Sequence, residues 1–388
     1  MKDLENYISA TVKDIPRSGI RDFFEIVAER KDVISLSIGE PDFVAPWHVR
    51  EATAYAVSHG ATSYTANLGM LELRNEISKY VNKNFKLSYN PKDEILVTVG
   101  ASEAIDIALR ALINPGDEVL YHEPCYVSYA PVISMAHGTP VLVETNVKDN
   151  FMLRADELEK KVTIKTKVLM LNFPTNPTGA TLTHEVAKEI AEFAVKHDLI
   201  VITDEIYSEL TYDDDRISIA NLPGMRDRTI FIHGMSKAWA MTGYRIGYVC
   251  APPVLLEAMM KIHQYTIMCA PVLSQKAGIE ALRNGDDKVA EMREEYNRRR
   301  NFIIAELNEM GISCHKPEGA FYVFPNISKF GMTSKEFCMK FLDEYDVACV
   351  PGTAFGKCGE GFIRCSYATA FDSIKEAMKR LRCFIKDL

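Results

Sequence analysis

The chain has 388 residues, and its content of 47% hydrophobic and 25% charged residues is typical of a globular protein with a large buried core. A formal net charge of −8 at pH 7 argues against nucleic acid or an anionic membrane surface as a partner. No apolar run approaches the roughly 18–20 residues that a membrane span requires, so we expect no membrane partner.

Short apolar runs alternate with helical stretches from residue 94 onward. Residues 94–99 are predicted to form a strand and residues 102–112 a helix, which ends at the turn sequence Asn114-Pro115-Gly116. Several later runs are nearly continuous in Val, Ile and Leu, which is typical of strands covered on both faces. Further strands are predicted at 117–123, 139–145, 167–174, 199–207, 228–234 and 245–252. The pattern predicts an α/β domain with a mainly parallel sheet, which binds ligands at the carboxyl ends of its strands.

The pattern changes after about residue 280. A long charged helix is predicted at 286–310, and short strands with two amphipathic helices follow, which indicates a smaller α+β domain. The short strands are predicted at 321–324, 347–351 and 361–367. We therefore expect an N-terminal segment at 1–45, a large domain at 46–285 and a small domain at 286–388.

The cysteines and the N-terminal residues indicate the compartment. The nine cysteines include no Cys-x-x-Cys pair, which argues against a disulfide framework or a zinc site and favours reduced thiols. The N-terminal residues contain neither the apolar segment nor the cleavage site of a signal peptide. We expect a cytoplasmic protein without a bound metal.

Residues 234–247 contain the motif that carries the chemistry. Lys237 closely follows a predicted strand, which places its amine at the carboxyl end of the sheet. Arg245 follows eight residues later between Gly243 and Gly247, which allow the backbone to approach a ligand closely. A Ser-Lys pair alone would be more consistent with a solvated surface lysine. The full spacing, however, resembles the Schiff-base segment of class I aminotransferases, which use pyridoxal 5′-phosphate (PLP).

This resemblance implies a fold type I PLP-dependent transferase with a seven-stranded, mainly parallel sheet in the large domain. It also implies that Lys237 forms the Schiff base with PLP, that Ser236 contacts the cofactor and that Arg245 binds the phosphate. A primary amine suits the aldehyde, and a planar guanidinium suits the phosphate dianion. By the same resemblance, we expect residues 1–45 to pack on the small domain and on a partner subunit.

Other matched positions surround the PLP ring. Asn176 matches the family's Asn-Pro-x-Gly loop, which binds the PLP 3′-oxygen and the substrate, although a plain Pro/Gly turn is the alternative. Asp204 follows the largely apolar run 199–203, where a carboxylate needs a partner. The resemblance implies that Asp204 binds the pyridine nitrogen of PLP and that the neighbouring Glu205 points to the opposite face. Tyr207 would reach the 3′-oxygen, and Tyr126 would stack on the ring, unless it is an ordinary core residue.

The phosphate site is expected at the start of a helix. Gly100, Ala101 and Ser102 lie between a predicted strand and a predicted helix, where free N–H groups and the positive end of the helix dipole bind phosphate. Ser102 is also a candidate for the helix cap, and both roles are compatible. Tyr64 matches the tyrosine that reaches the phosphate from the neighbouring subunit, so the resemblance implies a homodimer with shared active sites.

Two positions match the family's binding site for the substrate carboxylate. Arg364 lies within a predicted strand, where an arginine more often faces solvent, but it matches the arginine that binds the α-carboxylate through a bidentate contact. Gly39, in a Gly-Glu-Pro-Asp sequence, matches the segment beside that carboxylate.

The matched positions imply an aminotransferase that moves the amino group of an L-amino acid to a 2-oxo acid such as 2-oxoglutarate by a ping-pong mechanism. The chain most resembles the branch of aromatic-amino-acid, N-acetyl-diaminopimelate and aspartate aminotransferases, which implies aromatic or broad specificity. The stretch 263–271, neutral apart from His263, offers no clear cation for a second carboxylate. N-acetyl-diaminopimelate and aspartate are alternative substrates. The rival interpretations are a β-lyase or cyclising lyase on the same scaffold, and an inactive binding protein. The presence of every matched residue argues against the binding protein.

Overall fold

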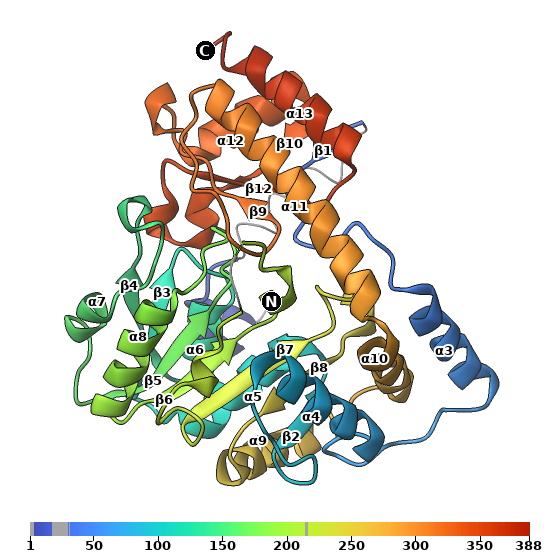
Figure 1. The fold of residues 1–388 in the computed structure, drawn as a ribbon. Coiled ribbons are helices and arrows are strands. Elements are labelled where there is room, and N and C mark those ends of the chain that lie inside the picture. The colour runs from blue at the N-terminus through green and yellow to red at the C-terminus, as the bar shows by residue number, and fades with distance from the viewer. Residues whose placement is uncertain (1–3, 18–29, 31, 214–215) are drawn as a thin grey trace.

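The computed structural model of the chain describes residues 4–17, 30, 32–213 and 216–388. The strands of its largest sheet are β2 (Ile95–Thr98), β3 (Glu118–Glu123), β4 (Thr139–Glu144), β5 (Thr166–Asn172), β6 (Ile200–Asp204), β7 (Thr229–Gly234) and β8 (Gly247–Cys250). They lie in the order β2-β8-β7-β6-β5-β3-β4 (Figure 1). Neighbouring strands are parallel except at β8, which is antiparallel to both β2 and β7. The expected mainly parallel, seven-stranded sheet is confirmed.

Helices cover both faces of this sheet. They are α3 (Trp47–Ser58), α4 (Leu71–Phe85), α5 (Gly100–Leu112), α6 (Tyr129–Met135), α7 (Ala155–Glu159), α8 (His184–Lys196), α9 (Pro253–Thr266) and α10 (Val272–Asn284). Helices α5, α6 and α9 pack on one face, and α4, α8 and α10 on the other. Successive strand residues point to opposite faces, so Val201 packs with α8 and Ile202 with α5. This two-sided burial explains the continuous apolar runs.

A smaller α+β unit follows the large sheet. Its elements are α11 (Asp286–Glu309), β9 (Tyr322–Val323), α12 (Ser334–Tyr345), β10 (Val347–Ala348), β11 (Val350–Pro351), β12 (Ile363–Ser366) and α13 (Phe371–Phe384). Strands β11, β12 and β9 form an antiparallel sheet in that order. Helices α11, α12 and α13 share one apolar core with it, to which Phe337, Phe341 and Ile374 contribute. Within the described residues, no helix is both long and apolar enough to cross a membrane.

The helix after β2 begins two residues earlier than the sequence pattern predicted. Its first residue is Gly100, whose φ of +75° turns the chain sharply out of the strand. Val99 is therefore the N-cap residue and Ser102 lies in the first turn. The Glu103 carboxylate accepts the Val99 N–H at 2.5 Å, so the interpretation of Ser102 as the helix cap is wrong.

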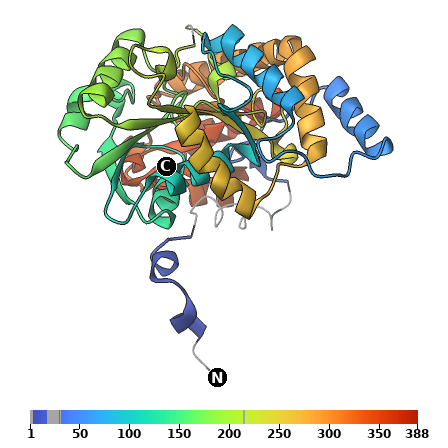
Figure 2. The ribbon, with the colours of Figure 1, turned by 90° about the horizontal axis from the view of Figure 1, so that it is seen from below.

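The described N-terminal residues lie in two places. The 3₁₀ turn η1 (Leu4–Tyr7) and α1 (Ala10–Lys13) project from the rest of the molecule, and none of their residues is buried (Figure 2). Strand β1 (Ile34–Ser35) pairs in parallel with β10 of the smaller unit. The predictions for residues 1–3, 18–29 and 31 lie outside the described residues, and contact of this segment with a partner subunit stays a prediction.

Candidate active site

The sheet brings three predicted site residues to one edge. Asp204 ends β6 and is paired in register with Asn172, the last residue of the neighbouring β5. Asn176 follows β5 after a short turn. Strand β7 runs parallel to β6 and ends at Gly234, three residues before Lys237. Because parallel strands end at the same edge, these polar residues gather where such sheets bind ligands.

Lys237 lies in a half-buried position with its amine turned towards the N-terminal segment. Its Nζ donates a hydrogen bond to the Gly39 carbonyl at 2.7 Å. The rings of Tyr207 and Phe321 lie with their centroids 5.7 and 5.8 Å from this nitrogen. Burial, and next the nearby Arg364 guanidinium, lower the pKa of the amine to about 8. Near physiological pH, a substantial fraction of the molecules therefore carries this amine in its neutral, nucleophilic form.

Asp204 is 4% exposed and has few partners. It accepts hydrogen bonds from the Tyr129 hydroxyl at 2.8 Å and from the Ile206 N–H at 3.2 Å. Burial raises the pKa of its carboxyl, so a buried cationic N–H beside it would stabilise its ionised form. Tyr129 was not predicted from the sequence, although it lies three residues after Tyr126, and the two rings meet edge to face at 5.6 Å.

Arg364 is 2% exposed, and no acidic side chain pairs with it among the described residues. Its two terminal nitrogens donate to Asn176 Oδ1 at 3.0 Å and to the Ser37 carbonyl at 2.5 Å. Its Nε is buried without a hydrogen-bond partner in the described chain. The guanidinium lies over the Tyr322 ring at 4.4 Å. A buried guanidinium in these surroundings is suited to bind a carboxylate.

Tyr322 is a second site residue that the sequence pattern did not single out. Its hydroxyl is 2.9 Å from that of Tyr207, which links β9 to the turn after β6. A Cβ on Gly39 would lie 2.8 Å from the same hydroxyl and 3.8 Å from a nitrogen of Arg364. Glycine at position 39 therefore allows the backbone to pass close to the Tyr322 hydroxyl and the Arg364 guanidinium.

Gly100 and Arg245 lie together at the start of α5. A Cβ on Gly100 would lie 2.7 Å from Nη2 of Arg245, and a Cβ on Gly247 would lie 2.6 Å from the Gly100 carbonyl carbon. The Arg245 side chain is exposed and its Nη1 donates to the Thr242 carbonyl at 3.1 Å. The helix start and the guanidinium thus form one anion-binding corner.

The remaining predicted residues differ in exposure. Ser236 is buried, Ala101 and Tyr126 are half-buried, and Ser102 is exposed. Tyr64 is 81% exposed, beside an open hollow of about 460 Å³ formed mainly by residues 60–66 and 70–72. No described contact joins Tyr64 to another predicted site residue of its own chain.

Comparison with known proteins identifies the family. Residues 31–381 match the model of aminotransferase class I and II. YugH of Bacillus subtilis (strain 168) is 52% identical over 382 residues, which cover 98% of this chain and 99% of that protein. An aspartate aminotransferase of Pyrococcus abyssi is 48% identical, with 95% and 96% covered. A crystal structure of an aromatic aminotransferase from Pyrococcus horikoshii superposes with a TM-score of 0.90 at 47% identity, with 95% and 99% covered.

The chain therefore belongs to the class I and II aminotransferases, and it is a PLP-dependent enzyme of fold type I. PLP presents an aldehyde, a phosphate and a pyridine nitrogen. The residues present fit all three groups: the low-pKa amine of Lys237, the anion-binding corner at Gly100 and Arg245, and the buried, under-partnered Asp204.

Proposed function

We propose that the chain transfers the amino group of an aromatic L-amino acid, or of a broad range of L-amino acids, to a 2-oxo acid such as 2-oxoglutarate. The observation that carries this proposal is Arg364, a buried cation to which the described part of the chain offers no acidic partner. It lies beside Asn176 and lowers the pKa of Lys237. The amino donor and the 2-oxo acid acceptor both carry an α-carboxylate that suits this guanidinium.

In this proposal the chain holds the cofactor through groups on several strand ends. Lys237 attaches it, Asp204 binds the pyridine nitrogen, and Tyr207 and Asn176 bind the 3′-oxygen. Tyr126 stacks on the ring. The phosphate is held by residues of the same chain and by Tyr64 of the partner subunit; the residues of the same chain are Gly100, Ala101, Ser102, Ser236 and Arg245. When bound, PLP supplies the electron sink that weakens the bonds at the substrate Cα.

The protein side of the reaction is binding, orientation and proton transfer. Arg364 would bind the substrate α-carboxylate, with Asn176 and the backbone at Gly39 helping to fix its orientation. Once the amino acid has displaced it from the cofactor, the Lys237 amine would take the proton from the substrate Cα and deliver it to the C4′ carbon of the cofactor. Its lowered pKa favours this role, since a general base acts best when its pKa is near the working pH.

Aromatic or broad specificity is favoured by the groups around Arg364. The rings of Tyr322 and Phe355 lie 4.4 and 4.8 Å from its guanidinium carbon. His263 is buried, and its Nδ1 lies 2.6 Å from Glu103 Oε1. Because Glu103 already pairs with it, His263 is not available to bind a second carboxylate of a dicarboxylic substrate. N-acetyl-diaminopimelate and aspartate are the alternative donors that a test must include.

A homodimer in the cytoplasm is also part of the proposal. Tyr64 and Tyr265 are both highly exposed, and Asn67 ties their segments together by donating to the Met268 carbonyl at 2.8 Å. Such exposed aromatic side chains favour a partner surface. All nine cysteines lie in the described part of the chain as free thiols, which favours a reducing compartment.

Borohydride reduction tests the attachment of the cofactor. The purified protein should be yellow, and reduction should fix the cofactor to the peptide that contains Lys237. The Lys237→Ala variant should fold and lose the half-reaction completely. Labelling of a different lysine would refute the assignment.

A panel of amino donors tests the reaction and the substrate. Each donor is mixed with the holoenzyme without an acceptor, and pyridoxamine phosphate is measured. Aromatic donors should produce it at the highest kcat/KM, ahead of aspartate and N-acetyl-diaminopimelate. Release of the donor's side chain with return to PLP would instead identify a β-lyase.

A further inference from the structure

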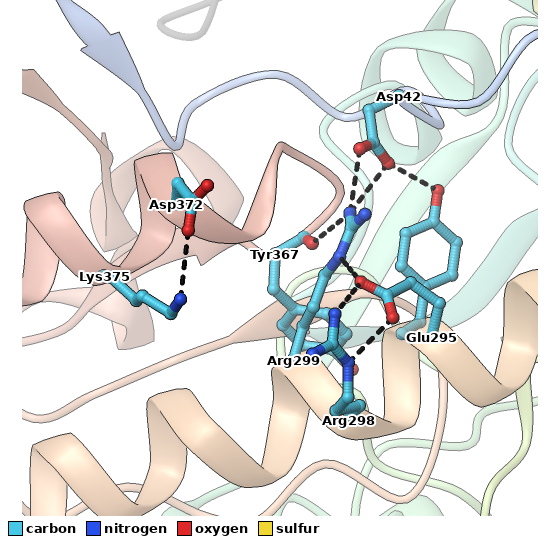
Figure 3. A network of polar contacts seen from close by, with 8 residues as sticks. Asp42, Glu295, Arg298, Arg299, Tyr367, Asp372 and Lys375 are labelled. Atoms are coloured by element: carbon cyan, nitrogen blue, oxygen red, sulfur yellow. Dashed lines mark hydrogen bonds and ion pairs between the residues drawn. The ribbon is translucent and has the colours of Figure 1, made fainter.

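A partly buried ion pair joins the N-terminal segment to the long helix α11. Arg299, whose side chain is 7% exposed, donates from Nη1 to both carboxylate oxygens of Asp42, each at 2.9 Å (Figure 3). Its Nε donates to Glu295 at 2.9 Å, and Nη1 also lies 3.3 Å from the Tyr367 carbonyl. The Tyr296 hydroxyl donates to the same Asp42 carboxylate at 3.3 Å. Asp42 is thus held by two side chains of one helix.

The segment between Leu36 and Asp42 has few other attachments. Leu36 makes two backbone hydrogen bonds. Its N–H donates to the Ala348 carbonyl at 2.8 Å, and its carbonyl accepts from the Ser366 N–H at 2.7 Å. Beyond it, the carbonyls of Ser37 and Gly39 accept bonds from Arg364 and Lys237. None of the described backbone hydrogen bonds is donated by residues 38–42.

The carbonyls of Ser37 and Gly39 accept hydrogen bonds from side chains that have other tasks in the proposed function. Arg364 is to bind a substrate carboxylate, and Lys237 is to hold the cofactor and move a proton. The Lys237 contact therefore competes with cofactor binding, whereas the Ser37 contact uses only one nitrogen of the Arg364 guanidinium. The contact between Asp42 and Arg299 involves neither of these two side chains, so cofactor and substrate do not compete for it.

We propose that Asp42 and Arg299 are positioning residues that hold residues 37–42 over the amino-acid site. The inference rests on the proposed function, since it assigns the segment to the substrate. The segment carries Gly39, whose missing Cβ allows the backbone to pack closely against Tyr322 and beside Arg364. A displaced segment would misplace this wall and the Ser37 carbonyl that orients the guanidinium. The loss should therefore fall on amino-acid binding and spare cofactor binding.

The chain offers a matched control on the same helix. Arg298 also pairs with Glu295, through Nε and Nη2 at 2.8 Å each, but its side chain is exposed (Figure 3). The Arg298→Gln variant removes one positive charge and one ion pair without touching Asp42. It separates positioning of the segment from a general effect of charge.

The experiment compares the holoenzymes of wild type, Asp42→Asn, Arg299→Lys and Arg298→Gln. Arg299 is largely buried while Asp42 is partly exposed, so loss of either partner should raise KM for the amino donor by about tenfold in the first two variants. Their kcat should stay within about twofold and their absorption spectrum should be unchanged, since the residues contact neither the cofactor nor the transferred proton. Hydrogen exchange in peptides covering residues 36–44 should be faster.

The Arg298→Gln variant should match wild type in all these measurements. An unchanged KM in both Asp42→Asn and Arg299→Lys would overturn the proposal, as would unchanged hydrogen exchange or an equal loss in Arg298→Gln. Failure of the wild type to form pyridoxamine phosphate would refute the proposed function instead. The hydrogen-exchange comparison does not depend on that result, so the two failures are distinguishable.

Discussion

Adjacent residues at the end of β6 carry carboxyl groups in very different surroundings. Asp204 faces the site and meets Tyr129 at 2.8 Å. Glu205 faces away and accepts hydrogen bonds from the hydroxyls of Ser218 at 2.5 Å and Ser208 at 3.2 Å. The alternation of side chains along a strand separates the two carboxyl groups, although their sequence positions differ by one. Only Asp204 lies where a cofactor nitrogen would need it.

The Asp204→Ala variant should lose turnover far more than cofactor affinity. Removal of one preorganised electrostatic partner lowers kcat by about 10²–10³-fold, while Arg245 and the start of α5 still hold the phosphate. Single-turnover rates at saturating donor measure the first quantity, and retained absorbance after gel filtration measures the second. Near-normal turnover would make Asp204 a structural residue.

The neighbouring Glu205→Gln variant serves as the control and has its own pH signature. Burial raises the pKa of the Glu205 carboxyl from 4.5 to about 7, against the opposing hydrogen bond from Ser218. Between these values the folded state binds a proton that the unfolded state lacks, so stability falls as pH rises through this window. Glu205→Gln should keep most of the turnover and flatten the change in Tm between pH 4.5 and 7. A loss of turnover like that of Asp204→Ala would contradict the assignment.

At the scale of the elements, the sequence predicted where the strands lie better than it predicted strand direction or the start of helix α5. Continuous apolar runs identify strands because both faces are buried, as Val201 and Ile202 illustrate. Nothing in the run at 245–252 indicates that β8 is antiparallel to its neighbours, because direction depends on the path between strands. The start of α5 was misplaced because the positive φ of Gly100 is set by packing against β8.

Contacts between distant elements account for the site residues that were missed. Tyr129 meets Asp204 across 75 positions, Tyr322 meets Tyr207 across 115, and Arg299 meets Asp42 across 257. Local propensity and periodicity carry no information at such separations. The matched motifs, in contrast, were visible because each is a short run with its own chemistry.

Helix α12 offers a test of local stabilisation outside the site. Thr333 accepts the Glu336 N–H at 3.2 Å and Glu336 accepts the Thr333 N–H at 2.9 Å, which forms a capping box. Thr333→Ala should lower the free energy of unfolding by about 1 kcal/mol, as measured by urea denaturation of the holoenzyme. Thr333→Ser should restore most of it, and turnover should not change. A change in KM would mean that α12 influences the site.

At the scale of the whole molecule, several exposed aromatic side chains lie on connected segments. Trp47 and Tyr55 lie on α3, which packs against α10, and Tyr64 lies beside a hollow that α10 also borders. Scattered exposed apolar residues are ordinary, but a connected group of large aromatic side chains favours a protein surface as the partner. In a two-fold dimer the same surface would face itself.

Complementation between two defective subunits tests whether the active sites are shared. If Tyr64 reaches the partner's cofactor, a mixed dimer of Lys237→Ala and Tyr64→Ala has one site with both defects and one site with neither. Random pairing makes about half of the dimers mixed, so about a quarter of all sites should be intact. The co-expressed variants should approach that fraction of wild-type activity, well above the sum of the separate variants, provided that Tyr64→Ala alone is clearly impaired. Verified mixed dimers without this recovery would mean that Tyr64 serves its own chain.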